Sequence, residues 1–168
     1  MAHTYASNFI HCIFSTKDRQ RLIADERMPL LFDCLGGVAK SEGFTLAAAG
    51  GTADHVHLLL LLPATHTVAH AVQKLKGSSS RWMGSGFAWQ EGYGAFSVSP
   101  SQVAVIKTYI RNQQRHHQKR SFEEGIQRAP SALRCRLRPS VRFWVRTDPS
   151  LRDCAIILGA VPHVETRG

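Results

Sequence analysis

The sequence lacks the features of a membrane-spanning or secreted protein. Its longest uninterrupted apolar run, residues 58–62, is far shorter than the roughly 20 residues that a helix needs to cross a bilayer. The first residues also lack the basic and then apolar order of a signal peptide. The 4 cysteines are widely spaced and form no C-x-x-C pair, which argues against a structural zinc site. We therefore expect a cytoplasmic chain with reduced thiols and no membrane partner.

Acidic residues are scarce beside basic ones. The chain has 12 Asp and Glu against 21 Lys and Arg, a formal net charge of +9, and a pI near 10.0. Such an excess favours a polyanionic partner, most commonly nucleic acid, although basic ribosomal and membrane-surface proteins share it. With 43% hydrophobic and 20% charged residues in a chain of 168, the composition is that of a globular domain with a tail.

The spacing of apolar residues predicts alternating strands and helices. Strands are expected at residues 8–14, 44–49, 55–62 and 87–99, and helices at residues 28–41, 67–83 and 100–119. Ser99 is a plausible N-cap for the last helix, and Pro100 suits its first turn. The order β-α-β-β-α-β is the split β-α-β plan of ferredoxin-like domains. We therefore predict an α+β fold: a four-stranded antiparallel sheet with helices on one face, followed by a C-terminal helix.

The end of the chain differs in composition from the rest. Arginines are interspersed there with Pro130, Pro139 and Pro149, and no convincing periodicity is present. The predicted organisation is one domain over residues 1–125 and an Arg- and Pro-rich appendage of uncertain structure over residues 126–168.

The most distinctive local motif is His55-Val56-His57. Alternate residues of a strand point to the same face, so both imidazoles would project together while Val56 faces the core. Two neutral imidazoles can bind one divalent ion, and the adjacent Asp54 could orient them. The alternative is that one histidine is exposed and the other packed.

A second motif lies on the last predicted helix. Tyr109 and Gln113 are four residues apart and so share one helical face. A tyrosine hydroxyl can attack a phosphodiester when a metal ion polarises the phosphate. The amide oxygen of Gln113 suits a hard cation such as Mg²⁺ or Mn²⁺. The alternative is that Tyr109 is a half-buried packing residue.

Several motifs together resemble a known family. G-T-A-D-H-V-H-L-L-L starts at Gly51, K-x-K-G at Lys74, W-Q-E-G-Y-G-A-F-S-V-S at Trp89, and Y-I-x-N-Q-x-x-H-H at Tyr109. In this order and spacing, residues 5–125 resemble the single-tyrosine HUH transposases. These are the insertion-sequence 200-like enzymes, together with their relatives associated with repeated palindromic elements. After Gly125 the chain departs from the family pattern.

The resemblance implies an activity and a set of site residues. His55, His57 and Gln113 would be the ligands of a divalent metal ion, Mg²⁺ or Mn²⁺. Tyr109 would be the nucleophile that joins a DNA 5′-phosphate, and the free 3′-OH would later attack that phosphotyrosine. The family implies a homodimer that acts on single-stranded DNA and recognises DNA hairpins, with Tyr109 on a C-terminal catalytic helix.

Basic residues near these motifs are candidates for contacts with DNA phosphates. They are Lys17, Arg19, Arg21, Lys74, Lys76, Arg81, Arg111 and Arg115. Trp89 or Tyr93 could stack on an unpaired base. Each cation is otherwise an ordinary surface charge, and Trp89 is otherwise a core residue.

Two other functions would also suit a basic ferredoxin-like domain. A non-catalytic hairpin-binding relative would need none of the four residues His55, His57, Tyr109 and Gln113, so their joint presence favours the enzyme. An RNA-binding ferredoxin-like module is expected to carry an RNP-type aromatic pattern, and the sequence has none.

Overall fold

The computed structural model describes residues 6–113, and its secondary structure follows the predicted order. The strands are β1 (Asn8–Ser15), β2 (Thr45–Thr52), β3 (His55–Leu62) and β4 (Gly94–Val98), and the helices are α1 (Met28–Ser41), α2 (Val68–Met83) and α3 (Val103–Arg111). Short 3-10 turns lie at Lys17–Arg19, Asp25–Arg27 and Pro100–Gln102. No helix within residues 6–113 is long and apolar enough to cross a membrane.

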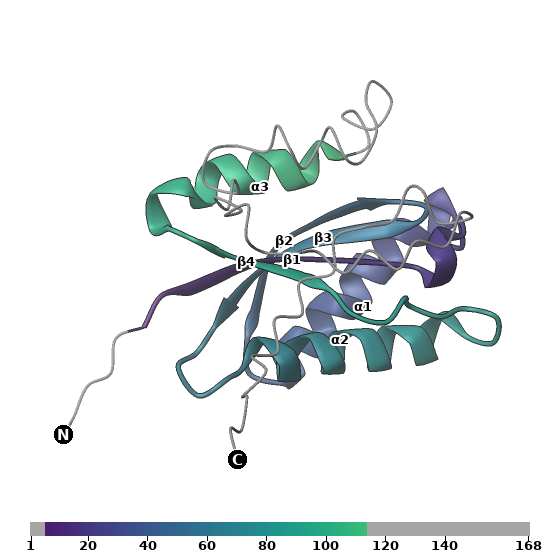
Figure 1. Ribbon diagram of the computed structural model, residues 1–168, viewed down its shortest axis with the longest axis horizontal. Coiled ribbons are helices and arrows are strands. Elements are labelled where there is room, and N and C mark those ends of the chain that lie inside the picture. The colour runs from purple at the N-terminus through teal and green to yellow at the C-terminus, as the bar shows by residue number, and fades with distance from the viewer. Residues whose placement is uncertain (1–5, 114–168) are drawn as a thin grey trace, which may run out of the picture.

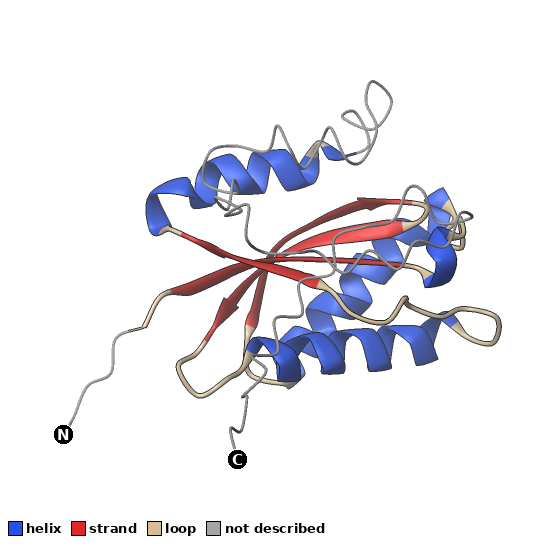
Figure 2. Cartoon of the chain, viewed as in Figure 1, coloured by secondary structure: helices blue, strands red, loops and turns tan. Residues whose placement is uncertain are grey.

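The strands form one antiparallel sheet in the order β2-β3-β1-β4. This order confirms the predicted split β-α-β topology. Helices α1 and α2 cover one face of the sheet, and α3 lies over the opposite face (Figure 1). In Figure 2 the red strands accordingly form a layer between two layers of blue helix.

The apolar sequence of β3 explains why both faces are covered. Leu58, Leu60 and Leu62 belong to a core shared with α1 and α2. Leu59 points the other way and packs against Ile106 and Ile110 of α3. A strand buried on both faces is expected to be apolar along its whole length rather than alternating. His55 and His57 share the parity of Leu59 and therefore lie on the α3 face.

The helix boundaries follow local chemistry. The hydroxyl of Thr67 caps α2 by accepting a hydrogen bond from the backbone N–H of His70 at 3.2 Å. Pro29 lies in the first turn of α1, where a missing N–H costs nothing. Gly84 follows α2 with a φ of 94°, a conformation that glycine adopts without strain.

Two strands differ from their predicted bounds by more than one residue at an end. β4 begins at Gly94 instead of residue 87, because the preceding residues form a loop. This loop meets the end of β1 through an isolated bridge between Thr16 and Trp89 and a hydrogen bond from the Gln90 N–H to the Ser15 carbonyl at 2.8 Å. β2 continues to Thr52, so that the turn before β3 contains only Ala53 and Asp54. The last helix was predicted to run to residue 119, but α3 ends at Arg111 with Asn112 as its C-cap. Residues 114–119 and the appendage at 126–168 lie outside the described residues.

Candidate active site

The two histidines of the H-x-H motif lie side by side beneath α3. Each is 1% exposed, and their ring centroids are 5.2 Å apart. Val56, between them, is buried in the core on the opposite face of the sheet. The predicted shared face is therefore confirmed, and the alternative of one exposed and one packed histidine is wrong.

His55 is held by the turn that precedes it. Its Nδ1 lies 2.7 Å from Oδ1 of Asp54 and 2.9 Å from the hydroxyl of Thr52. The Thr52 hydroxyl also donates to Asp54, at 2.7 Å, and Arg19 binds the other carboxylate oxygen at 3.1 Å. These contacts direct Nδ1 of His55 towards the carboxylate, so Nε2 is the nitrogen that can bind an ion.

The charge of Asp54 is stabilised in this network. Burial by itself raises the pKa of Asp54, but hydrogen bonds with His55 and Thr52 and the positive charge of Arg19 hold that pKa well below its usual range. Asp54 is therefore ionised at neutral pH and accepts the N–H of His55. The predicted orienting role of Asp54 agrees with this geometry, whereas Thr52 was not predicted.

His11 is a site residue that the sequence motifs did not reveal. It comes from β1, is 1% exposed, and places Nε2 at 3.1 Å from Nδ1 of His57. The two rings are stacked, with centroids 5.2 Å apart and planes inclined by 22°. Burial lowers the pKa of His11 to about 4, so that the ring is neutral at neutral pH. The available sequence signal was a single histidine in an otherwise apolar strand.

Helix α3 brings the predicted nucleophile to the histidines of its own chain. The Tyr109 ring lies 6.0 Å from that of His57 and 6.3 Å from that of His11, nearly perpendicular to both. Burial raises the pKa of Tyr109, and a side-chain hydrogen bond with Gln113 offsets part of that increase. Gln113 is itself 1% exposed. The four predicted site residues thus come from β3, from α3 and, for Gln113, from two residues past the end of α3.

A glycine lets α3 lie this close to the sheet. Gly50 of β2 pairs with His57 of β3, and a Cβ built on Gly50 would overlap the carbonyl oxygen of Ile110. No other residue type leaves this space empty. Ile106 and Ile110 complete the contact by packing against Ala48 and Leu59.

The side chains at this site suit a divalent cation in their chemistry. Within residues 6–113, no group of three or more His, Cys, Asp or Glu side chains is placed to hold an ion. Two imidazoles therefore need a ligand of another type, and the amide of Gln113 offers an oxygen. A mixed set of this kind leaves coordination positions for water or a phosphate oxygen.

The predicted DNA-contacting cations fall into three groups. Lys17, Arg21, Arg81 and Arg111 are exposed. Three others have partners within the protein: Arg19 binds Asp54, Lys74 binds Glu42 at 3.2 Å, and Lys76 donates to the carbonyls of Gln90 and Gly92 at 2.6 and 2.8 Å. Arg115 lies outside the described residues.

The two aromatic candidates for base stacking lie in or against the core. Trp89 is 9% exposed and donates its indole N–H to the hydroxyl of Ser79 at 2.9 Å. Tyr93 is half-buried and packs against the same core. The core interpretation of Trp89 is therefore the correct one.

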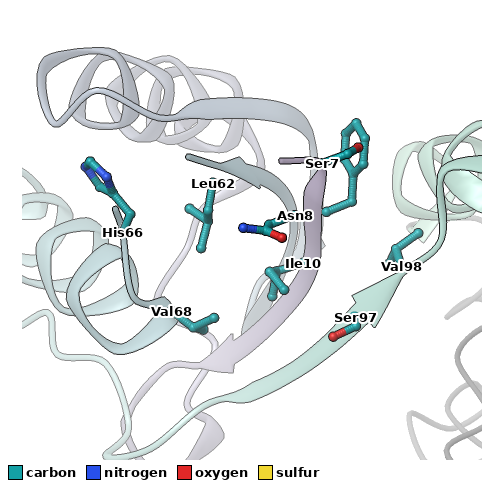
Figure 3. Close-up of a pocket in the computed structure, with 9 residues that line it drawn as sticks. Ser7, Asn8, Ile10, Leu62, His66, Val68, Ser97 and Val98 are labelled. Carbon is teal, nitrogen blue, oxygen red and sulfur yellow. The ribbon is translucent and has the colours of Figure 1, made fainter. Parts of the chain in front are cut away.

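A pocket of about 200 Å³ lies at the opposite end of β1 and β3 from His55. Its lining combines polar residues, among them Asn8 and His66, with apolar ones such as Leu62 and Val68 (Figure 3). Among residues 6–113, its lining includes no Lys or Arg that could recognise a phosphate.

Comparisons with known proteins agree with the geometry. The family model described as "Transposase IS200 like" matches residues 4–113. The transposases for insertion sequence element IS200 of Salmonella typhimurium and Salmonella typhi are each 27% identical over 124 residues, covering 67% of this chain and 81% of theirs.

Two solved structures are also similar. A protein of Deinococcus radiodurans R1, assigned as a transposase, is 32% identical, with a TM-score of 0.54 over 67% of this chain and 96% of its own. A REP-associated tyrosine transposase bound to a REP hairpin has a TM-score of 0.56 over 70% of this chain and 73% of its own. At 14% identity the latter likeness concerns the fold alone.

Proposed function

Since the chain belongs to the family of IS200-like transposases, we propose that it cuts and rejoins single-stranded DNA with Tyr109 as the nucleophile. The observation that carries this proposal is the position of Tyr109. Its ring lies 6.0 Å from that of His57, in a site that one chain assembles from β3 and α3.

Every atom exchanged in the covalent steps belongs to the tyrosine or to the DNA. The Tyr109 hydroxyl oxygen attacks the phosphorus of a phosphodiester, and the bond from phosphorus to the 3′ oxygen breaks. The tyrosine proton ends on the released 3′-OH, and the 5′-phosphate stays on Tyr109. Attack by a 3′-OH on this phosphotyrosine restores the phosphodiester and returns a proton to the tyrosine, so no nucleotide cofactor is consumed.

The surrounding side chains prepare the nucleophile and the phosphate site. Since burial raises the pKa of Tyr109, the hydroxyl is protonated at neutral pH and must lose its proton as it attacks. The hydrogen bond with Gln113 orients the hydroxyl. Mg²⁺ or Mn²⁺ held by His55, His57 and Gln113 would supply charge stabilisation at the phosphate.

Charge and family support a single-stranded or hairpin DNA substrate. The net charge is +9, and Lys17, Arg21, Arg81 and Arg111 are exposed. Several phosphate contacts by such residues predict an affinity that falls steeply with salt. Binding should favour hairpin DNA over blunt duplex of matched length, and equal affinity for the two would indicate nonspecific charge attraction.

We also propose that the protein is a homodimer. The strands β2 and β4 are the edges of the sheet, and exposed edges are commonly covered by pairing. Because α3 carries Tyr109 to the histidines of its own chain, the dimer is not needed to assemble the described site. Light scattering at micromolar concentration measures the assembly state, and a monomer would contradict this part of the proposal.

The deciding experiment looks for a covalent protein–DNA adduct. The protein is incubated with Mn²⁺ and single-stranded oligonucleotides from its own flanking DNA, then separated under denaturing conditions. A labelled adduct in the wild-type protein that Tyr109→Phe lacks supports the enzyme. Hairpin binding without any adduct supports the alternative, a catalytically inactive or domesticated hairpin-binding relative.

A further inference from the structure

We infer that His11 is a positioning residue for His57: its Nε2 accepts the N–H of His57 Nδ1 and so directs the other nitrogen of His57 towards the ion. This inference depends on the proposed metal-binding role of His57. It makes β1 part of a site whose predicted residues come from β3 and α3.

The contact between the two rings is close and enclosed. The nitrogens are 3.1 Å apart, within the range of a hydrogen bond, and each histidine is 1% exposed. The His11 ring also lies near Phe96 and Tyr109, with centroid separations of 6.2 and 6.3 Å. Because neighbours on several sides fix its orientation, His11 offers Nε2 to one partner, His57.

Hydrogen-bond chemistry determines the direction of this bond. A neutral imidazole has one N–H, so one ring must donate and the other accept. If His11 donated, the proton of neutral His57 would lie on Nε2, and that nitrogen could not bind an ion. If His57 donates from Nδ1, its Nε2 presents a lone pair. Only the second arrangement is compatible with metal binding through Nε2.

The same arrangement holds for His55 through a different partner. Asp54 contacts Nδ1 of His55 at 2.7 Å, just as His11 contacts Nδ1 of His57 at 3.1 Å. Each histidine of the H-x-H motif thus has one nitrogen engaged by a second residue, the usual arrangement around metal-binding histidines. Because the acceptor for His57 is a neutral ring, it adds no negative charge beside the phosphate site.

The geometry argues against His11 as a third ligand. Its Nε2 faces Nδ1 of His57. Within residues 6–113, no three His, Cys, Asp or Glu side chains are arranged to hold one ion.

Two substitutions of His11 separate its hydrogen-bonding role from its packing role. His11→Phe keeps a ring of similar size but removes the hydrogen-bond acceptor. The phenyl ring is apolar and can therefore occupy the same buried position. His11→Gln places an amide oxygen near the position of Nε2 and can accept the same N–H. His70→Gln on α2, where the side chain is 46% exposed, is the control for general loss of a histidine.

Affinity for Mn²⁺, measured by calorimetry, is the first readout. Loss of an outer partner of a ligating histidine commonly weakens metal binding by about 10- to 100-fold, and we expect a loss of this size in His11→Phe. We expect His11→Gln to stay near the wild-type value, and His70→Gln to be unchanged. Thermal unfolding of each variant establishes that it is folded.

The tautomer of His57 is the second readout, and packing alone would not change it. Nitrogen-15 spectra of histidine-labelled protein with Mg²⁺ are expected to show a proton on Nδ1 of His57 in the wild type and in His11→Gln. In His11→Phe the chemical shift of that proton should no longer be that of a hydrogen-bonded N–H.

The outcomes distinguish failure of this inference from failure of the proposed function. Unchanged affinity in a folded His11→Phe would overturn the inference alone. A loss in His11→Gln as complete as in His57→Ala would overturn it too, because His11 would then be a ligand. Unchanged affinity in His57→Ala would overturn the proposed metal site itself.

Discussion

The carbonyl oxygen of Ile110 occupies the space where any side chain on Gly50 would begin. Gly50 pairs across the sheet with His57, and Ile110 directly follows Tyr109. This contact therefore sets the distance between the helix that carries the proposed nucleophile and the strand that carries the proposed metal ligands. The absence of a side chain on Gly50 is therefore a requirement of both the fold and the geometry of the site.

Gly50→Ala is expected to displace α3 from the sheet. The new methyl group meets backbone on α3, which cannot move aside as a flexible side chain can. Overpacking of this kind typically costs about 1–3 kcal/mol, measurable as a lower free energy of unfolding in urea. Formation of the DNA adduct should fall further than this loss of stability accounts for, because Tyr109 moves with the helix.

Gly37→Ala is the matched control for this substitution. Gly37 lies within α1, and a Cβ there would meet nothing within 4 Å. Since alanine is the better helix former, we expect a gain in stability of about 0.5–1 kcal/mol and unchanged adduct formation. A Gly50→Ala protein as stable and as active as wild type would contradict the close seating of α3.

Tyr109→Phe should abolish the covalent adduct while leaving hairpin affinity close to that of the wild type. Only the hydroxyl oxygen is removed, and the ring keeps its contacts with His57 and His11. Denaturing gels measure the adduct, and a mobility shift measures hairpin binding. Tyr93→Phe should retain both activities, and an adduct that persists in Tyr109→Phe but disappears in Tyr93→Phe would move the nucleophile to Tyr93.

Lys76→Met tests whether this lysine contacts DNA or organises the protein. Its Nζ donates to the carbonyls of Gln90 and Gly92 in the loop before β4. Removing a donor that serves one partly buried carbonyl and one exposed carbonyl should cost about 1 kcal/mol of unfolding free energy. Urea unfolding measures this loss, which DNA-phosphate contact alone would not produce.

Arg81→Met supplies the comparison for Lys76. Arg81 is exposed at the end of α2, so its loss should leave stability nearly unchanged and weaken hairpin binding at low salt. If Lys76→Met and Arg81→Met behave alike in both assays, the two cations have the same role and the structural assignment of Lys76 is incorrect.

The sequence predicted those parts of the site that local patterns specify. The strand period placed His55 and His57 on one face, and the helical period did the same for Tyr109 and Gln113. The predicted bounds of β3 and α1 agree with the structure, since both are strongly apolar and end at proline, glycine or a tight turn. Where the residues of a single strand or helix determine its conformation, the amino-acid sequence is enough to predict its bounds and which side chains share a face.

Contacts between distant segments could not be predicted in the same way. His11 reaches His57 only through the register of β1 against β3, and Gly50 matters only because α3 crosses above it. Lys76 is indistinguishable in sequence from an exposed cation, yet it binds the loop before β4. That loop contains aromatic residues typical of strands, but tertiary contacts leave only Gly94–Val98 in β4.

Each proposed metal ligand can be removed by a single substitution. His55→Ala, His57→Ala and Gln113→Ala should each lower Mn²⁺ affinity by more than about tenfold, because each removes one of three protein ligands. Cleavage should fall in parallel. Calorimetry on the purified variants measures affinity, and His70→Ala on the exposed side of α2 should match the wild type.

Deletion of residues 129–168 is the complementary test, and it should affect neither metal affinity nor cleavage. This segment is rich in Arg and Pro, so its removal should weaken DNA binding through lost positive charge, an effect that added salt masks. The three ligand variants test whether β3 and the end of α3 suffice to bind the ion. If the deletion loses Mn²⁺ binding as fully as His57→Ala does, those elements do not suffice, and the C-terminal segment helps to build the site.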